Sequence, residues 1–262
     1  MGGQLTLVVD CGGTGIKAGL VTESGALIGE SVRFPTPYPL SPEGIIAVIA
    51  GIYDKNPGAD RVTVGMPGMI RHGIVVYTPH YITESGPFTA INPQLAQQWD
   101  NFDMQAYLAN QLGVPVRVLN DAEIHGYGVI TGKGLELVLT LGTGLGTAWY
   151  DNGKLAPHLE ISHAPVRIGT AIPGGGRRDT VTYDTYIGDT MLKQLGAGHW
   201  SERVAAVVNS LRPVFWWDHL YLGGGNAANI SELTAAAFGD DISIVPNESA
   251  LIGGAKLWQL NR

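Results

Sequence analysis

Two similar segments, about 130 residues apart, constrain the fold more than any other feature of the sequence. D-C-G-G-T-G-I-K-A-G-L-V occupies residues 10–21, and L-G-T-G-L-G-T-A-W-Y occupies residues 141–150. Each segment has the pattern of a strand, a Gly-Thr-Gly turn and a second strand that contains Gly or Ala. A repeat at half the length of the chain predicts two lobes, each built on a copy of the same β-hairpin.

The hydrophobic pattern predicts an α/β protein that opens with an antiparallel meander. Its strands are expected at 5–9, 16–21 and 26–33, and Ser41 is expected to cap a helix of about a dozen residues. Further strands are predicted at 61–65, 114–119, 135–141, 145–150 and 219–222. Further helices are predicted at 92–113, 122–128, 182–195, 201–211 and 247–260.

The composition excludes several classes of protein. Lys and Arg number 16 and Asp and Glu number 23, so the net charge of −7 argues against a nucleic-acid binder that works through bulk positive charge. Cys11 is the single cysteine, so no internal disulfide can form, and no Cys/His cluster has zinc-ligand spacing. The sequence shows neither a signal peptide nor an apolar run long enough to span a bilayer. We therefore expect a cytoplasmic protein with no structural zinc and no membrane or nucleic-acid partner.

The glycine turns have the chemistry of a phosphate site. Glycine lets the backbone approach a phosphate closely and turn successive N–H groups toward it. Thr14 and Thr143 add hydroxyl donors, and Asp10 could hold a metal ion through water. The alternative is that each segment is only a tight hairpin turn.

Other nucleotide-binding motifs fit the sequence less well. The segment from Gly128 to Lys133 resembles a Walker A loop but is one residue short and is followed by Gly134. No G-x-G-x-x-G motif follows a strand and opens a helix. The run Gly223-Gly224-Gly225-Asn226 follows a predicted strand, which suits contact with a nucleotide at a helix N-terminus or a plain strand-to-helix turn.

Candidate acid–base and substrate residues follow the predicted strands. Asp121 ends a buried strand and could accept the proton of a hydroxyl that Asn120 orients, or could simply cap the next helix. Glu160 and His163 lie three residues apart and could converge on one substrate, or be a solvated Glu and a surface His. The basic pair 177–178 follows three glycines and could contact an anionic substrate or form part of a solvated connector.

Five motifs in order resemble those of the ROK sugar kinases, within the superfamily of actin-like proteins, sugar kinases and Hsp70 ATPases. They are D-C-G-G-T-G-I-K, V-G-M-P-G, L-N-D-A, L-G-T-G-L-G and L-G-G-G-N. The short chain and T-G-I-K-A-G resemble the polyphosphate glucokinase branch. The resemblance implies a two-lobed, actin-like (ribonuclease H-like) α/β fold with a cleft between the lobes. It implies an N-terminal lobe of residues 1–120 with a returning helix at 248–262, and a C-terminal lobe of residues 121–247.

The resemblance also implies transfer of a phosphoryl group from ATP or polyphosphate, with Mg²⁺, to the 6-hydroxyl of a hexose, with glucose the first choice. Asp121 matches the catalytic base. The positions that match sugar ligands are Asn120, Glu160, His163 and Gly68. The positions that match the donor site are Asp10 (also the metal position), Gly12, Gly13, Thr14, Lys17, Gly142, Thr143, Gly144, Gly223, Gly224, Gly225 and Asn226. A homodimer is expected.

Three departures from the family pattern affect these expectations. The Cys-rich zinc motif of many members is missing, and Ser162 replaces the Gly of E-x-G-H. The segment 78–87 lacks the usual Asn-containing sugar loop, where His80 or Glu84 could substitute. The alternative functions are a sugar-responsive transcription regulator of the same family, disfavoured because the first strand already begins at Leu5, and a non-catalytic sugar-binding protein.

Overall fold

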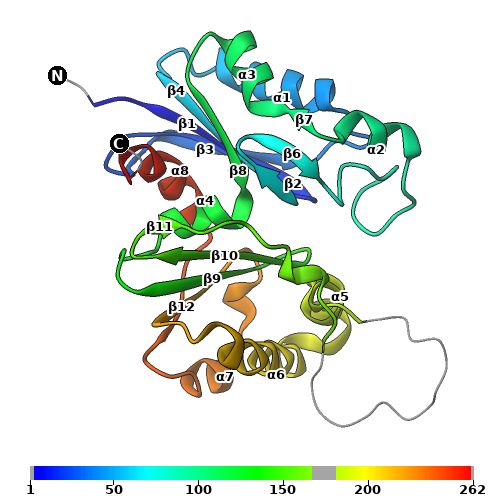
Figure 1. Ribbon diagram of the computed structural model, residues 1–262, viewed down its shortest axis with the longest axis vertical. Helices are drawn as coiled ribbons and strands as arrows, with labels where there is room; N and C mark the ends of the chain where they lie inside the picture. The colour runs from blue at the N-terminus through cyan, green and yellow to red at the C-terminus, as the bar shows by residue number, and fades with distance from the viewer. Residues whose placement is uncertain (1–2, 167–180, 261–262) are drawn as a thin grey trace. The chain divides into compact units, whose positions relative to one another are not determined.

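The computed structural model describes residues 3–166 and 181–260, and its chain forms two compact units (Figure 1). The first unit comprises residues 1–130 and 248–262, and the second comprises residues 131–247. The boundary lies ten residues after the one expected at 120/121, because the helix that follows Asn120 packs within the first unit. The basic pair 177–178 and the glycines before it lie outside the described residues.

A five-stranded mixed sheet with the order β3-β2-β1-β4-β8 forms the centre of the first unit. β1 is antiparallel to β2, β2 is antiparallel to β3, and β1, β4 and β8 are parallel. The strands are β1 (Thr6–Cys11), β2 (Gly15–Val21), β3 (Leu27–Pro35), β4 (Arg61–Met66) and β8 (Val116–Asn120).

The second unit repeats this sheet strand for strand. Its order is β11-β10-β9-β12-β13, with β9, β10 and β11 antiparallel in turn and β9, β12 and β13 parallel. The strands are β9 (Leu135–Leu141), β10 (Leu145–Asp151), β11 (Lys154–Leu155), β12 (His219–Gly223) and β13 (Ile242–Ile244). The two sheets share one order and one pattern of directions, as the repeated turn motif predicts.

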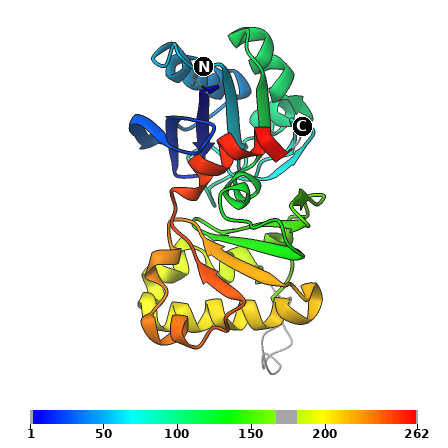
Figure 2. The same cartoon turned by 90° about the vertical axis from the view of Figure 1, so that its left-hand side faces the viewer.

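Helices cover both faces of the first sheet. Ser41 caps α1 (Pro42–Asp54), as predicted, and this helix packs with α3 (Met104–Leu112) over Leu7, Val9 and the other large apolar side chains of one face. α4 (Asp121–Tyr127) and α8 (Ser249–Leu260) cover the opposite face (Figure 2). α2 (Pro93–Trp99) and a small sheet of β5 (Met69–Arg71), β6 (Ile74–Tyr77) and β7 (Phe102–Asp103) complete this unit.

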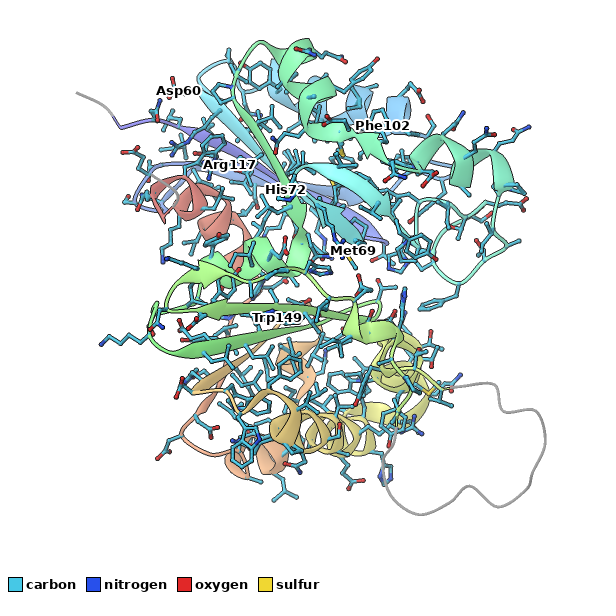
Figure 3. The ribbon with its side chains drawn as sticks, in the orientation of Figure 1. Asp60, Met69, His72, Phe102, Arg117 and Trp149 are labelled. Atoms are coloured by element: carbon cyan, nitrogen blue, oxygen red, sulfur yellow. The ribbon has the colours of Figure 1, made fainter. Side chains whose placement is uncertain are left out.

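Glycine allows α8 to lie close to its neighbours. A Cβ on Gly253 would overlap the carbonyl oxygen of Ile124 in α4, so only glycine fits there. At the C-terminal end of α8, the guanidinium of Arg117 stacks 4.3 Å from the ring centre of Trp258 (Figure 3 labels Arg117). These contacts tie the last helix to the first unit.

The helices of the second unit are η1 (Ile161–His163), α5 (Tyr183–Ile187), α6 (Asp189–Phe215), η2 (Ala227–Asn229) and α7 (Glu232–Ala236). They differ from the prediction of two helices at 182–195 and 201–211, because α6 runs through the kink at Gly196. The helix expected at 92–113 is instead α2 and α3, separated by β7. Trp149 of β10 lies in the hydrophobic core of the second unit (Figure 3). Within the described ranges no helix is long and apolar enough to cross a membrane.

Candidate active site

The first glycine turn, residues 12–15, connects β1 to β2. The Gly12 N–H donates to Gly15 O at 2.9 Å and closes the turn. Among the residues that the structure describes, the N–H groups of Gly13 and Thr14 have no hydrogen-bond partner. Two adjacent backbone donors without partners form an anion-binding concavity.

The second glycine turn, residues 142–144, connects β9 to β10 in the same way. The Gly142 N–H donates to Gly144 O at 3.0 Å, and the N–H groups of Thr143 and Gly144 have no partner in the described part of the chain. The Gly142 carbonyl accepts hydrogen bonds from the Asp189 N–H at 3.1 Å and from Asn226 Nδ2 at 3.1 Å. As far as the chain is described, each unit therefore presents two consecutive unpaired N–H groups at the equivalent turn.

The run Gly223 to Asn226 lies directly against the second glycine turn. The Asn226 N–H donates to Leu141 O at 2.9 Å, and Gly224 has φ +85° with its Cα against the backbone of Leu141. The run is not directly followed by an α-helix N-terminus: the 3-10 turn η2 comes next, and α7 begins only at Glu232. The run that suits contact with a nucleotide and the second glycine turn are thus neighbours.

A row of charged side chains, which we call the charge row, crosses the first sheet. Asp10, Lys17 and Arg33 are directly opposite one another in the register of β1, β2 and β3, so their side chains share one face. Burial raises the pKa of the Asp10 carboxyl to about 6, although the charges of Lys17 and Arg33 oppose this shift. No salt bridge among the described residues includes Lys17 or Arg33.

Gly65 brings Asp121 to the acidic end of the charge row. Gly65 pairs with Asp10 in the parallel register, and a Cβ on it would lie 3.4 Å from Asp10 Oδ1 and 3.4 Å from Asp121 Cα. Because this strand position has no side chain, the first turn of α4 lies beside Asp10. The predicted base and the predicted metal position are therefore neighbours in the first unit.

The cap of α4 is Asn120 and not Asp121. Asn120 Oδ1 accepts the Ala122 N–H at 2.8 Å, while the Asn120 N–H donates to Glu123 Oε2 at 3.0 Å, which completes a capping box. Asp121 is the first helical residue, and its Oδ1 also accepts the Ala122 N–H, at 2.9 Å. The helix therefore has its cap without Asp121.

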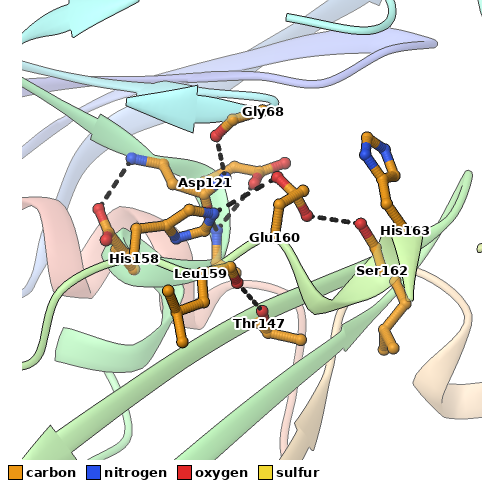
Figure 4. Close-up of polar contacts among 12 residues, drawn as sticks. Gly68, Asp121, Thr147, His158, Leu159, Glu160, Ser162 and His163 are labelled. Atoms are coloured by element: carbon orange, nitrogen blue, oxygen red, sulfur yellow. Dashed lines mark hydrogen bonds and ion pairs between the residues drawn. The ribbon is translucent and has the colours of Figure 1, made fainter. Parts of the chain in front are cut away.

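Asn120 also joins the V-G-M-P-G motif to the start of α4. Its Nδ2 donates to Gly68 O at 2.9 Å (Figure 4), and Gly68 has φ +103°, a conformation that favours glycine. The Asn120 side chain is 3% exposed, and the capping box places the Glu123 N–H on its oxygen beside the Ala122 N–H, so within the described residues it keeps one amide hydrogen beyond these bonds. Gly68 thus orients the Asn120 side chain through its carbonyl oxygen.

In the second unit, Glu160 is held by its sequence neighbours. Ser162 Oγ donates to Glu160 Oε1 at 2.6 Å, and His158 Nε2 lies 3.4 Å from Glu160 Oε2 (Figure 4). Burial alone would raise the pKa of Glu160, but the hydrogen bonds from His158 and Ser162 and the charges of His158 and His163 hold it below its ordinary value. The carboxylate is fixed and ionised, ready to accept hydroxyl hydrogens.

His163 connects this carboxylate region to the second glycine turn through Asp184. His163 Nε2 lies 3.8 Å from Asp184 Oδ2, and Asp184 Oδ1 accepts the Leu145 N–H at 2.7 Å. Burial raises the pKa of Asp184, although the Leu145 N–H and His163 oppose the shift. Asp184 could not be predicted from the sequence, because nothing in the spacing of the chain indicates its contact with Leu145, 39 residues earlier.

The loop that resembles Walker A holds a side chain of this protein instead of a phosphate. The Glu136 carboxylate accepts the N–H groups of Thr131 at 2.6 Å, Gly132 at 2.7 Å and Lys133 at 3.2 Å. The Tyr221 hydroxyl also donates to it, at 2.9 Å, and Glu136 is fully buried. The N–H groups of this loop that could bind a phosphate are therefore already bonded to the Glu136 carboxylate.

The sequence of this chain is similar to those of known sugar kinases. The sequence profile of the ROK family matches residues 6–159. The polyphosphate glucokinase of Mycobacterium tuberculosis (strain CDC 1551 / Oshkosh) is 27% identical over 261 residues, which cover 94% of this chain and 88% of that protein. The glucokinase of Streptomyces coelicolor is 30% identical over 157 residues, which cover 58% of this chain and 45% of that protein.

The fold of this chain is also similar to the solved structures of sugar kinases. The crystal structure of inorganic polyphosphate/ATP-glucomannokinase from Arthrobacter sp. strain KM matches with a TM-score of 0.77 and 28% identity, over 99% of this chain and 100% of that one. A ROK family glucokinase from Streptomyces griseus shares the fold with a TM-score of 0.69 and 20% identity, over 97% of this chain and 98% of that one. The profile match over more than half of the sequence and these full-length likenesses show that the chain belongs to the ROK family.

Proposed function

We propose that this protein is a hexose kinase that transfers a phosphoryl group from ATP or inorganic polyphosphate to the 6-hydroxyl of glucose or a related hexose. The named activities of the polyphosphate glucokinase and the glucomannokinase support both the reaction and the choice of donors. The observation that carries the proposal is the shared construction of the two glycine turns. Each offers two adjacent N–H groups that have no partner among the residues the structure describes, which suits the oxygen atoms of a chain of phosphates.

Asp121 is the base in this proposal. Its carboxylate accepts the proton of the hexose hydroxyl while the hydroxyl oxygen forms a bond to the terminal phosphorus atom of the donor. The bond from that phosphorus to the bridging oxygen breaks, and ADP or a shortened polyphosphate leaves with the electron pair. Positioning and electrostatic stabilisation account for most of the rate acceleration in such transfers.

Asp10 fits a Mg²⁺ position of the kind that phosphoryl-transfer enzymes use. Among residues 3–166 and 181–260, no group of three or more His, Cys, Asp and Glu side chains could hold a metal by itself. Mg²⁺ commonly takes one or two carboxylates and completes its shell with water and substrate phosphates, so a single carboxylate beside a phosphate turn suffices. The ion would neutralise charge on the donor phosphates.

The hexose is assigned to Glu160, His163 and Asn120. The ionised Glu160 carboxylate accepts sugar hydroxyl hydrogens, and the remaining amide hydrogen of Asn120 donates to a sugar oxygen near Asp121. Glucose is the first choice because the curated relatives include polyphosphate glucokinases and glucokinases. Mannose is the second, because the glucomannokinase matches nearly the whole chain.

A crossed assay tests the proposal. Wild-type protein is incubated with Mg²⁺, with ATP or polyphosphate, and with glucose, mannose or N-acetylmannosamine, and the sugar 6-phosphate is measured. Asp121→Asn should lower kcat by about 10²- to 10⁴-fold while hexose binding persists. Asp103→Asn is the matched control, because Asp103 also accepts an N–H at the start of a helix, 3.0 Å from Ala106 N. No phosphorylated hexose with either donor, or full turnover by Asp121→Asn, contradicts the proposal.

A further inference from the structure

A threonine from outside the first glycine turn holds the backbone of that turn. Thr36, which directly follows β3, donates from Oγ to Gly12 O at 2.7 Å. The N–H of the same threonine donates to Thr14 O at 3.3 Å. Thr36 is 7% exposed, so both bonds are sheltered from water.

Two tyrosines hold the same turn. The Tyr38 hydroxyl donates to Gly13 O at 2.7 Å, and the Tyr81 hydroxyl donates to Gly12 O at 3.3 Å. The two rings contact edge to face with centres 6.3 Å apart, so each supports the position of the other. We call Thr36, Tyr38 and Tyr81 the carbonyl clamp.

The carbonyl clamp determines where the unpaired N–H groups of the turn point. A peptide unit is planar and trans, so the C=O of one residue and the N–H of the next point in opposite directions. Holding Gly12 O therefore aims the Gly13 N–H, and holding Gly13 O aims the Thr14 N–H. These are the two N–H groups that have no partner within the described residues.

The second glycine turn has the same construction with different donors. Gly142 O accepts from the Asp189 N–H and Asn226 Nδ2, and Thr143 O lies 3.3 Å from the Asp189 N–H. The N–H groups opposite these two carbonyls, on Thr143 and Gly144, are again those without a partner in the described part of the chain. Backbone and amide groups do in the second unit what hydroxyl side chains do in the first.

The loop that carries Tyr81 also packs on the turn. A Cβ on Gly13 would lie 2.7 Å from His80 Cδ2 and 3.1 Å from Pro87 Cγ. The ring of Phe88 contacts His80 edge to face, with centres 6.3 Å apart. The loop that departs from the family's sugar loop thus lies against the donor turn.

We propose that the carbonyl clamp is a set of positioning residues for the phosphoryl donor, which aims the Gly13 and Thr14 N–H groups at donor phosphate oxygens. The proposal rests on the proposed hexose kinase function. The hydroxyl groups of the carbonyl clamp do not contact the donor. They fix the orientation of the peptide groups whose N–H groups contact it. Prior orientation of donors toward developing charge is a main source of catalytic power in such sites.

Removal of single hydroxyl groups tests the carbonyl clamp. Tyr38→Phe and Thr36→Val should each raise the KM for the donor by about three- to tenfold. Tyr38→Phe leaves Gly13 O without a hydrogen bond from the carbonyl clamp, and Thr36→Val leaves Gly12 O with only the longer bond from Tyr81. The KM for hexose should stay within about twofold of wild type, and Thr36→Ser, which keeps a hydroxyl, should restore the donor KM. Tyr53→Phe is the matched control, since this half-buried tyrosine donates to Ala59 O at 3.5 Å.

Calorimetric titration with tripolyphosphate, without hexose, separates this proposal from the proposed function. Wild type and Tyr53→Phe should bind tripolyphosphate alike, and Tyr38→Phe and Thr36→Val several-fold more weakly at a temperature where the melting curve of each variant shows it to be folded. Equal affinity in all variants, equal rises in donor and hexose KM, or no binding to wild type overturns the carbonyl clamp. If the wild type phosphorylates no hexose but the titrations differ as expected, only the proposed function fails.

Discussion

The hydroxyl of Ser162 donates a hydrogen bond of 2.6 Å to Glu160 Oε1. Ser162 stands where the E-x-G-H pattern of the family has glycine, and it is 2% exposed. The departure from the pattern therefore adds a hydrogen bond to the carboxylate that we assign to the hexose.

Ser162→Ala should weaken hexose binding and shift its pH dependence. Loss of one hydrogen bond to a charged group raises the pKa of Glu160, because Ser162 is one of the groups that lower it. The acidic limb of kcat/KM for hexose should move to higher pH, with a KM about three- to tenfold higher. Ser243→Ala, which removes a serine hydroxyl bonded to His219 Nε2 at 2.9 Å, should leave both quantities unchanged. An unmoved acidic limb in Ser162→Ala would show that Ser162 does not act on Glu160.

Arg33→Ala should weaken donor binding while the fold keeps its stability. Arg33 and Lys17 face each other across β2 and β3, and like charges directly opposite destabilise a sheet. Among the described residues no carboxylate lies at ion-pair distance from this pair, so under the proposed function the phosphates of the donor are the partners we assign to it. We expect a donor KM about tenfold higher and a melting temperature equal to or above that of wild type.

Two further variants test whether the positive charge at this position causes the change in donor KM. Arg33→Lys keeps the charge and should retain most of the donor affinity, whereas Arg71→Ala removes an exposed arginine from another strand and should change nothing. The donor KM of Arg33→Ala should also depend less on salt, since one fewer cation is screened. A donor KM equal to wild type at low salt refutes this role of Arg33.

The register of β3 explains why Arg33 was not among the predicted site residues. Counting back from the pair Val21 and Leu27 places Ser31 opposite Lys17. The structure has an irregularity between Ala18 and Leu20 that shifts the pairing by two residues, next to Gly29 with φ +70°. A bulge of this kind depends on local backbone geometry that hydrophobic alternation does not encode.

The parts of the site that the sequence could predict are those confined to one turn. The glycine turns and the strand–helix junction at Asp121 are local patterns, and the structure has a turn or a junction at each of them. Thr36 and Tyr81 could not be found in this way, because they meet the turn only after distant segments of chain have packed. A proline-rich connector and a loop without periodicity carry no signal for such contacts.

His125 makes the first unit sensitive to acid. It is 3% exposed, its Nε2 has no hydrogen-bond partner among the described residues, and burial lowers its pKa from 6.5 to about 4. The unfolded chain binds a proton near pH 6.5 and the folded chain only near pH 4, so stability from this group is complete above pH 6.5 and is lost as pH falls toward 4. The full effect is about 3 kcal/mol.

Urea unfolding between pH 4 and 7.5 measures this dependence. His125→Leu cannot bind a proton, so its free energy of unfolding should fall less steeply between pH 6.5 and pH 4 than that of wild type. His199→Gln is the control, because this histidine is exposed, and it should follow the wild-type curve. Parallel curves for His125→Leu and wild type would mean that His125 does not titrate with folding.

Glu136 should matter for stability and not for the donor. Its buried carboxylate accepts three backbone N–H groups from residues 131–133 and the Tyr221 hydroxyl. Glu136→Gln would put an amide N–H₂ against donors that now meet a carboxylate oxygen, so we expect a loss of about 3 kcal/mol or more in the free energy of unfolding. Tyr221→Phe removes one of these bonds and should cost about 1 kcal/mol.

Lys133→Ala completes the test of this loop. Lys133 stands at the lysine of the Walker-like pattern and is exposed, but the anion position beside it is taken by Glu136. The donor KM of Lys133→Ala should therefore equal that of wild type, whereas Lys17→Ala should raise it by about tenfold. Donor kinetics for the two alanine variants, measured side by side with ATP and with polyphosphate, decide which lysine serves the phosphates. A higher donor KM in Lys133→Ala than in Lys17→Ala would move the donor site to the Walker-like loop and contradict the assignment to the glycine turns.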